Sequence, residues 1–156
     1  MKTKLIIPIV LGVVLFSCRE ATTEEKEVTQ ETIVAEEEHH YDENEAIVLD
    51  NGNKWVVVPE MMAFIKNIEN GVVAFSKKKN TTFEEHKTLS ILIDKNLEDL
   101  TSNCTMTGQA HDELHKWLLP FLDLASEYAE SENIEDAKAS FQKINQSFNE
   151  FKTYFE

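Results

Sequence analysis

The sequence predicts an all-α domain, an up-down-up-down four-helix bundle with a short N-terminal extended arm or hairpin. Between Pro59 and Phe155, apolar residues recur at intervals of three and four, which is the spacing of one helix face. Short polar segments divide this pattern into four stretches of roughly 18–24 residues, and short connections make consecutive helices antiparallel.

The first two helices have clear start signals. Pro59 suits the first position of a helix that we expect to continue to about Lys77. The second helix follows Thr81-Thr82, where Thr81 with Glu84 or Thr82 with Glu85 fits a capping box. His86 then falls on or beside the apolar face of this helix, where we expect a boundary histidine with a local hydrogen bond.

The third and fourth helices are predicted in the same way. The third is expected from Thr107-Gly108 to about Ser131, with Pro120 inside it as a bend and not a break, because the apolar pattern continues unshifted. Gly108 provides the backbone freedom that a tight connection requires. The fourth helix is expected after Asn133, a favourable N-cap residue.

A short segment of different composition precedes the helices. Residues 47–49 are apolar, Asn51-Gly52 is a turn signal, and residues 54–58 are β-branched and aromatic. A two-stranded hairpin alone is marginally stable in water, so this arm should pack on the bundle with Trp55 as its anchor. We assign residues 46–156 to one domain that comprises the arm and the bundle.

The N-terminus predicts export. Residues 1–17 form a signal peptide, because a positively charged start precedes an apolar run shorter than the roughly 20 residues of a membrane-spanning helix. The run ends in Leu-Phe-Ser-Cys18, which resembles the lipobox of bacterial lipoproteins and implies that Cys18 is lipidated. An ordinary secretory signal and a retained anchor are the alternatives. We expect a lipid-anchored protein of the cell envelope, on the inner or outer membrane, that faces the periplasm.

The net charge of the chain limits the classes of partner that it can bind. The chain has a formal net charge of −14, and residues 18–45 form an acidic linker with few apolar side chains, which predicts a disordered spacer. Such a chain repels the phosphates of nucleic acids. The linker also holds His39-His40 beside acidic residues. This pair could bind a divalent metal, although a solvated linker is the simpler interpretation.

The segment Asn103–Trp117 concentrates potential metal ligands. It contains Cys104, Met106, His111 and His115, and the two histidines, four residues apart, project from one side of a helix. One thiolate, one thioether and two imidazoles suit copper best and zinc next. In the predicted topology these residues share one end of the bundle with three further candidates, which would border the site or form a docking surface: Met61, Met62 and Trp55.

Other interpretations of this cluster stay open. A buried cysteine, a gap-filling methionine and two boundary histidines are ordinary packing residues in a helical bundle. Noncovalent haem binding is a further alternative, as is a Cys104-linked dimer. Cys104 with His111 could imitate a thiol–imidazole pair. The sequence contains no nucleophile elbow, phosphate-binding loop or H-E-x-x-H motif, so we expect no enzymatic activity and no catalytic residues.

Three segments also suggest a family. LDNGNKW, CTMTGQAHDELHKWLLPFLDL and the final FKTYFE resemble a group of small bacterial exported lipoproteins of unknown function. They are more distantly similar to a helical domain of unknown function associated with heavy-metal efflux adaptors. The resemblance covers roughly residues 49–156, and Met106, Gly108 and His111 are its most recognisable part. It implies a periplasmic helical domain connected with metal handling, and no established activity.

The combined expectation is a membrane-anchored periplasmic lipoprotein that binds copper, or zinc, through Cys104, Met106, His111 and His115. It would serve as a metal buffer or as an accessory to an efflux system. Its expected partners are the membrane, through the lipid anchor, and a metal-efflux or envelope protein. The alternative is a ligand-free structural or protein-interaction domain.

Overall fold

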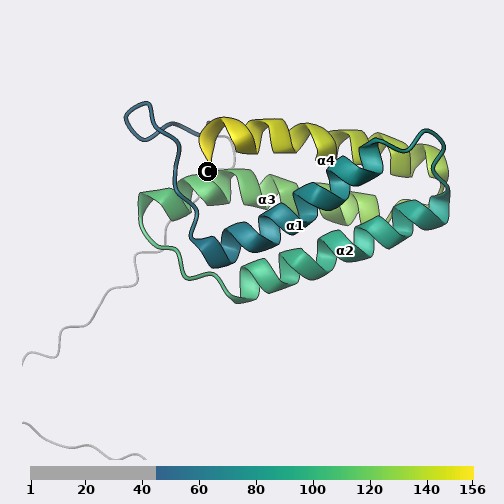
Figure 1. Cartoon of the computed structure of the whole chain (residues 1–156), viewed down its shortest axis with the longest axis horizontal. Helices are drawn as coiled ribbons and strands as arrows, with labels where there is room; N and C mark the ends of the chain where they lie inside the picture. Colours follow the sequence, from purple (N-terminus) through teal and green to yellow (C-terminus); the bar gives the residue numbers. More distant parts are fainter. Residues whose placement is uncertain (1–44) are drawn as a thin grey trace, which may run out of the picture. The chain divides into compact units, whose positions relative to one another are not determined.

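The computed structural model describes residues 45–156, and within them the chain forms the predicted four-helix bundle (Figure 1). The helices are α1 (Pro59–Ser76), α2 (Phe83–Ser102), α3 (Gln109–Ala129) and α4 (Ile134–Tyr154). Consecutive helices are antiparallel. The predicted signal peptide, Cys18, the His39-His40 pair and the acidic linker up to residue 44 lie outside the described residues.

Local signals fix where the helices begin. Thr82 and Glu85 form the predicted capping box, in which Glu85 N–H donates to the Thr82 hydroxyl at 3.3 Å and Thr82 N–H donates to the Glu85 carboxylate at 2.9 Å. At the start of α4, Asp136 N–H donates to the Asn133 side chain at 3.0 Å. These bonds satisfy backbone donors that the first turn of a helix leaves unpaired.

The α2–α3 connection depends on one backbone conformation. Gly108 directly precedes α3 and has φ 71° and ψ −165°, a combination that only glycine adopts without strain. α3 then continues through Pro120 to Ala129, so the proline does not break the helix, as predicted. The helix ends two residues before the expected Ser131.

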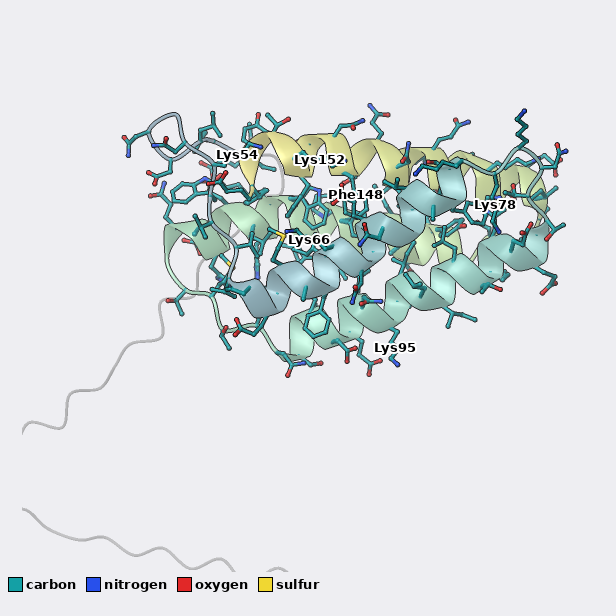
Figure 2. All side chains as sticks on the ribbon, viewed as in Figure 1. Lys54, Lys66, Lys78, Lys95, Phe148 and Lys152 are labelled. Carbon is teal, nitrogen blue, oxygen red and sulfur yellow. The ribbon has the colours of Figure 1, made fainter. Side chains whose placement is uncertain are left out.

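The core lies along the whole bundle axis. α2 packs against the other three helices, and the remaining neighbouring pairs are α1 with α4 and α3 with α4. Ile65, Ile68 and Leu114 have no exposed surface. Phe148 lies between the helices and Lys95 points outward, as Figure 2 shows. Full burial of one such apolar side chain stabilises the fold by about 1.5–3 kcal/mol.

The N-terminal arm, residues 45–58, is extended and not a regular hairpin. A tight turn joins Asp50 to Asn53, with positive φ at Asn51 (49°) and Gly52 (91°), as the Asn-Gly signal predicts. Beyond the turn, the arm pairs in parallel with the end of the chain. Trp55 N–H donates to the Tyr154 carbonyl at 2.8 Å, and Glu156 N–H donates to the Trp55 carbonyl at 2.9 Å. The C-terminus therefore holds the arm, and Trp55 is its buried anchor, only 8% exposed.

Candidate functional site

The arm defines one end of the bundle, called here the arm end. α1 and α3 begin there, and α2 and α4 finish there (Figure 1). The predicted cluster belongs to this end, because it comprises the α2–α3 connection and the first turns of α3. Met61, Met62 and Trp55 are all buried at this end. All three belong to the hydrophobic core, so they offer no exposed surface for docking.

The histidine pair is assembled as the helical spacing predicts. His111 and His115 lie on successive turns of α3 and are both half-buried, with ring centroids 4.1 Å apart and ring planes inclined by 50°. Asp112 places a carboxylate oxygen 3.7 Å from His111 Nδ1. This ring separation makes the pair a candidate for ligating one metal ion.

Electrostatics favour the ligand form of His115. Burial lowers the pKa of His115 below its usual 6.5, the nearby His111 lowers it further, and Asp112 opposes both effects. A lowered pKa keeps His115 neutral at pH values where an exposed histidine begins to gain a proton. Only the neutral imidazole has a nitrogen lone pair available for a metal.

The sulfur residues are placed differently from the histidines. Cys104 is partly buried against the core and lines a pocket with Glu60 and Phe64 of α1. Met106 is 7% exposed and belongs to the hydrophobic core. Among residues 45–156, no three His, Cys, Asp or Glu side chains gather closely enough to hold a metal ion together. The structure thus brings His111 and His115 together but does not assemble the predicted four-ligand set.

A buried ion pair that the sequence analysis missed fastens the arm to α3. Glu113 is 3% exposed, and its carboxylate accepts hydrogen bonds from Val48 N–H and Lys116 Nζ, each at 2.9 Å. Lys116 also reaches Glu45 at 3.2 Å. Trp55 Nε1 donates to the Val48 carbonyl at 2.7 Å, so both backbone groups of Val48 are bound. The only local signal was the Glu-x-x-Lys spacing on one helix.

The pKa of Lys116 follows from this arrangement. Burial alone lowers it, but hydrogen bonds to Glu113 and Glu45 outweigh that effect and raise the pKa above its usual 10.5. The lysine therefore stays charged and keeps the Glu113 carboxylate compensated. We call these contacts among Glu45, Val48, Glu113 and Lys116 the arm latch.

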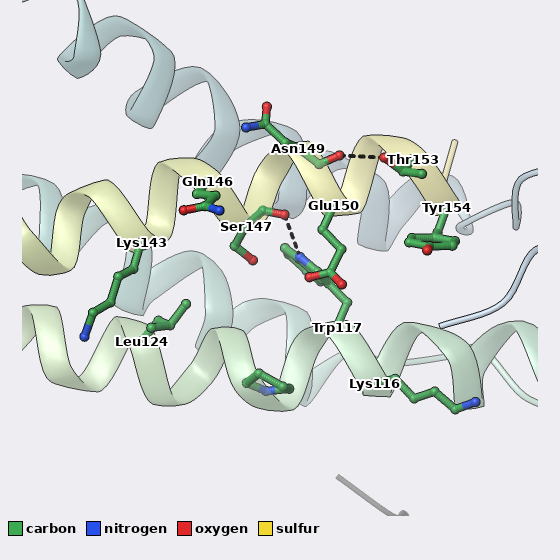
Figure 3. A pocket seen from close by; sticks show the side chains of 11 residues that line it. Lys116, Trp117, Leu124, Lys143, Gln146, Ser147, Asn149, Glu150, Thr153 and Tyr154 are labelled. Carbon is green, nitrogen blue, oxygen red and sulfur yellow. Dashed lines mark hydrogen bonds between the residues drawn. The ribbon is translucent and has the colours of Figure 1, made fainter. Parts of the chain in front are cut away.

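A groove of about 650 Å³ runs between α3 and α4 (Figure 3). At its centre Trp117 Nε1 donates to the Ser147 carbonyl at 3.2 Å. Lys116 and Lys143 both line it, but Lys116 belongs to the arm latch and Lys143 pairs with Glu127 at 2.7 Å. Because acids already compensate both lysines, the groove is a weaker candidate for an anion site than the histidine pair is for a metal site.

Comparisons with protein-family models, with curated proteins and with solved structures find no match to this chain. In the part of the chain that the structure describes, no helix combines the length and the apolar character needed to cross a bilayer.

Proposed function

We propose that the protein is a lipid-anchored domain of the cell envelope that binds a transition-metal ion, copper in its Cu(II) form, through His111 and His115. The observation that carries this proposal is the 4.1 Å separation of the two rings on successive turns of α3. A bidentate imidazole pair on a rigid helix needs little reorganisation to bind, because the helix fixes the spacing before the ion arrives.

The choice of metal follows from the available donors. Imidazole suits copper, zinc, iron and nickel, and at a given nitrogen site Cu(II) binds most tightly of the common divalent ions. The described contacts do not bring a thiolate to the histidines, which lowers the preference for Cu(I). Cys104 and Met106 remain predicted ligands, and Cys104 would have to move closer to the two histidines to join them.

A binding titration tests the proposal. The chain without residues 1–18, carrying His39→Ala and His40→Ala to remove the linker histidines, is titrated with Cu(II) and then Zn(II) by calorimetry. We expect one Cu(II) per chain with a submicromolar Kd. His111→Ala or His115→Ala should weaken binding at least about tenfold, equivalent to about 1.4 kcal/mol.

Matched variants decide which residues participate. Lys95→Ala on the outer face of α2 should leave the Kd unchanged, because this side chain is exposed and on another helix. Cys104→Ser and Met106→Leu show whether sulfur joins the site. Binding no tighter than micromolar, or equal affinity in His111→Ala, would favour the alternative of a ligand-free interaction domain.

The proposed role is a metal buffer or an accessory to an efflux system. The distant resemblance to a helical domain associated with heavy-metal efflux adaptors supports this role, and so does the acidic composition of the chain, which attracts cations diffusely. The predicted lipid on Cys18 would keep the metal site at the membrane, beside its expected efflux or envelope partner.

A further inference from the structure

His86 lies at the end of the bundle opposite the arm, called here the distal end, and is only 2% exposed. Each ring nitrogen meets a hydroxyl group: Nδ1 lies 2.8 Å from Tyr128 Oη of α3, and Nε2 lies 3.0 Å from Thr81 Oγ1. The rings of Phe75 from α1 and Phe141 from α4 pack edge-on against it, with centroids 4.7 Å and 5.9 Å away. One histidine thus contacts side chains from the other three helices.

This environment fits the neutral imidazole. A neutral ring has one donor and one acceptor nitrogen, and a hydroxyl can fill either complementary role. A protonated ring has two donors, so both hydroxyls would have to accept from it. The positive charge would also lie among two phenylalanine rings, a buried position that disfavours an ion without a directly bound counter-ion.

The surroundings of His86 lower its pKa. Burial is the main cause that lowers its pKa below 6.5; Lys138 of α4 lowers it further and Glu85 on α2 opposes them. The Glu85 carboxylate is itself engaged by Lys78 at 2.6 Å and by the Thr82 cap. Tyr128 stays a neutral hydroxyl, because burial raises its pKa.

We propose that His86 makes the distal end of the bundle acid-sensitive, with proton uptake placing an uncompensated charge among the rings of Phe75 and Phe141 and loosening the junction of the four helices. The sign of the pH effect on stability follows from the difference between the folded and unfolded pKa of this histidine. An unfolded histidine with pKa 6.5 binds protons more readily than folded His86, so stability is complete above pH 6.5. It falls as the pH drops between 6.5 and the folded-state pKa, and then levels off.

Amide hydrogen exchange at pH 7.5 and 5.5, corrected for intrinsic exchange rates, tests the acid sensitivity of the distal end. The protein used is the chain without its predicted signal peptide. We expect residues 72–90 and 125–141 to lose protection by about tenfold at pH 5.5. His86→Gln preserves one donor and one acceptor but cannot take up a proton, so it should abolish the loss. His115→Gln removes the histidine at the arm end whose pKa burial also lowers. In this variant the loss at the distal end should remain, while α3 near the arm keeps its protection.

Three results would overturn the proposal: equal loss of protection in His86→Gln, no loss in the native chain, or a uniform loss at both ends of His115→Gln. Direct NMR titration of the His86 ring in the native chain gives a second test that does not depend on the folding of a variant. A ring pKa at or above 6.5 would also reject acid sensitivity through His86.

Discussion

Gly108 shows how one residue shapes the candidate site. Its φ of 71° with ψ of −165° ends the α2–α3 connection and starts α3, three residues before His111. A Cβ at this position would meet nothing within 4 Å, so the barrier to substitution is backbone conformation and not space. This requirement was predictable from the sequence, because the glycine stands between two strong helical patterns.

Gly108→Ala should lower the free energy of unfolding by about 1–3 kcal/mol, the cost of a non-glycine residue in this conformation. Urea denaturation followed by circular dichroism measures it. Gln109→Ala, at the next and exposed position, is the control and should change stability by less than about 0.5 kcal/mol. Equal stability of Gly108→Ala and the native chain would show that the connection does not need this conformation.

Other residue-level features were less predictable. The sequence placed His86 near the core face with a local hydrogen bond, but its bond to Tyr128 joins two helices. Nothing in the sequence pattern indicated that Glu113 is buried, and the structure buries it against Val48. In both cases the partner comes from a distant segment, and neither the periodicity nor the charge pattern around the residue specifies it.

At the scale of elements, the four helices were predictable because their signals are local. The Thr82–Glu85 box, the Asn133 cap and the apolar spacing all act within a few residues. The arm was predictable only in part. Its Asn-Gly turn is local, whereas its parallel pairing with the chain terminus joins the two ends of the domain. Topology and burial determine that pairing, and no nearby residue indicates it.

The arm latch gives the prediction at this scale. In Glu113→Gln, one carboxylate oxygen becomes an NH₂ group. This group faces either Lys116 Nζ or Val48 N–H, and because both of these are donors, one of them loses its acceptor. We expect a loss of about 1–3 kcal/mol in unfolding free energy, since one buried polar group loses its partner. Chemical denaturation measures it, and Lys143→Gln, which removes a more exposed ion pair with Glu127, should cost less than about 1 kcal/mol.

A double-mutant cycle separates the latch from general damage. If Glu113 and Lys116 act as one unit, Lys116→Met should cost less in the Glu113→Gln background than in the native chain. Strictly additive costs would mean that the two side chains stabilise the arm independently, which would contradict the latch.

At the scale of the whole molecule, the proposed lipid anchor and the helical bundle would have separate roles. The predicted lipid would set location, the acidic linker would supply distance, and the bundle would present the histidine pair at the end where the arm enters. The bundle itself is described by the structure, whereas the anchor is a prediction from the lipobox resemblance.

Cys18→Ala should therefore move the protein from the membrane fraction to the soluble fraction of the cell, because a thioether-linked lipid can no longer form. Fractionation with immunodetection measures the change, and mass spectrometry of the native protein should find a lipidated Cys18 at the mature N-terminus. Ser17→Ala keeps a small residue before the cysteine and should leave the distribution unchanged. Membrane association that persists in Cys18→Ala would contradict lipid anchoring.

The central claim is that His111 and His115 bind one metal ion together. Nitrogen-15 NMR of the histidine ring nitrogens during titration with Zn(II), a diamagnetic stand-in for Cu(II), tests it most directly. We predict that one ring nitrogen of each residue shifts in concert and that both saturate at one equivalent, while His86 stays unchanged. Independent shifts of the two rings, or no shift of either at one equivalent, would contradict the account.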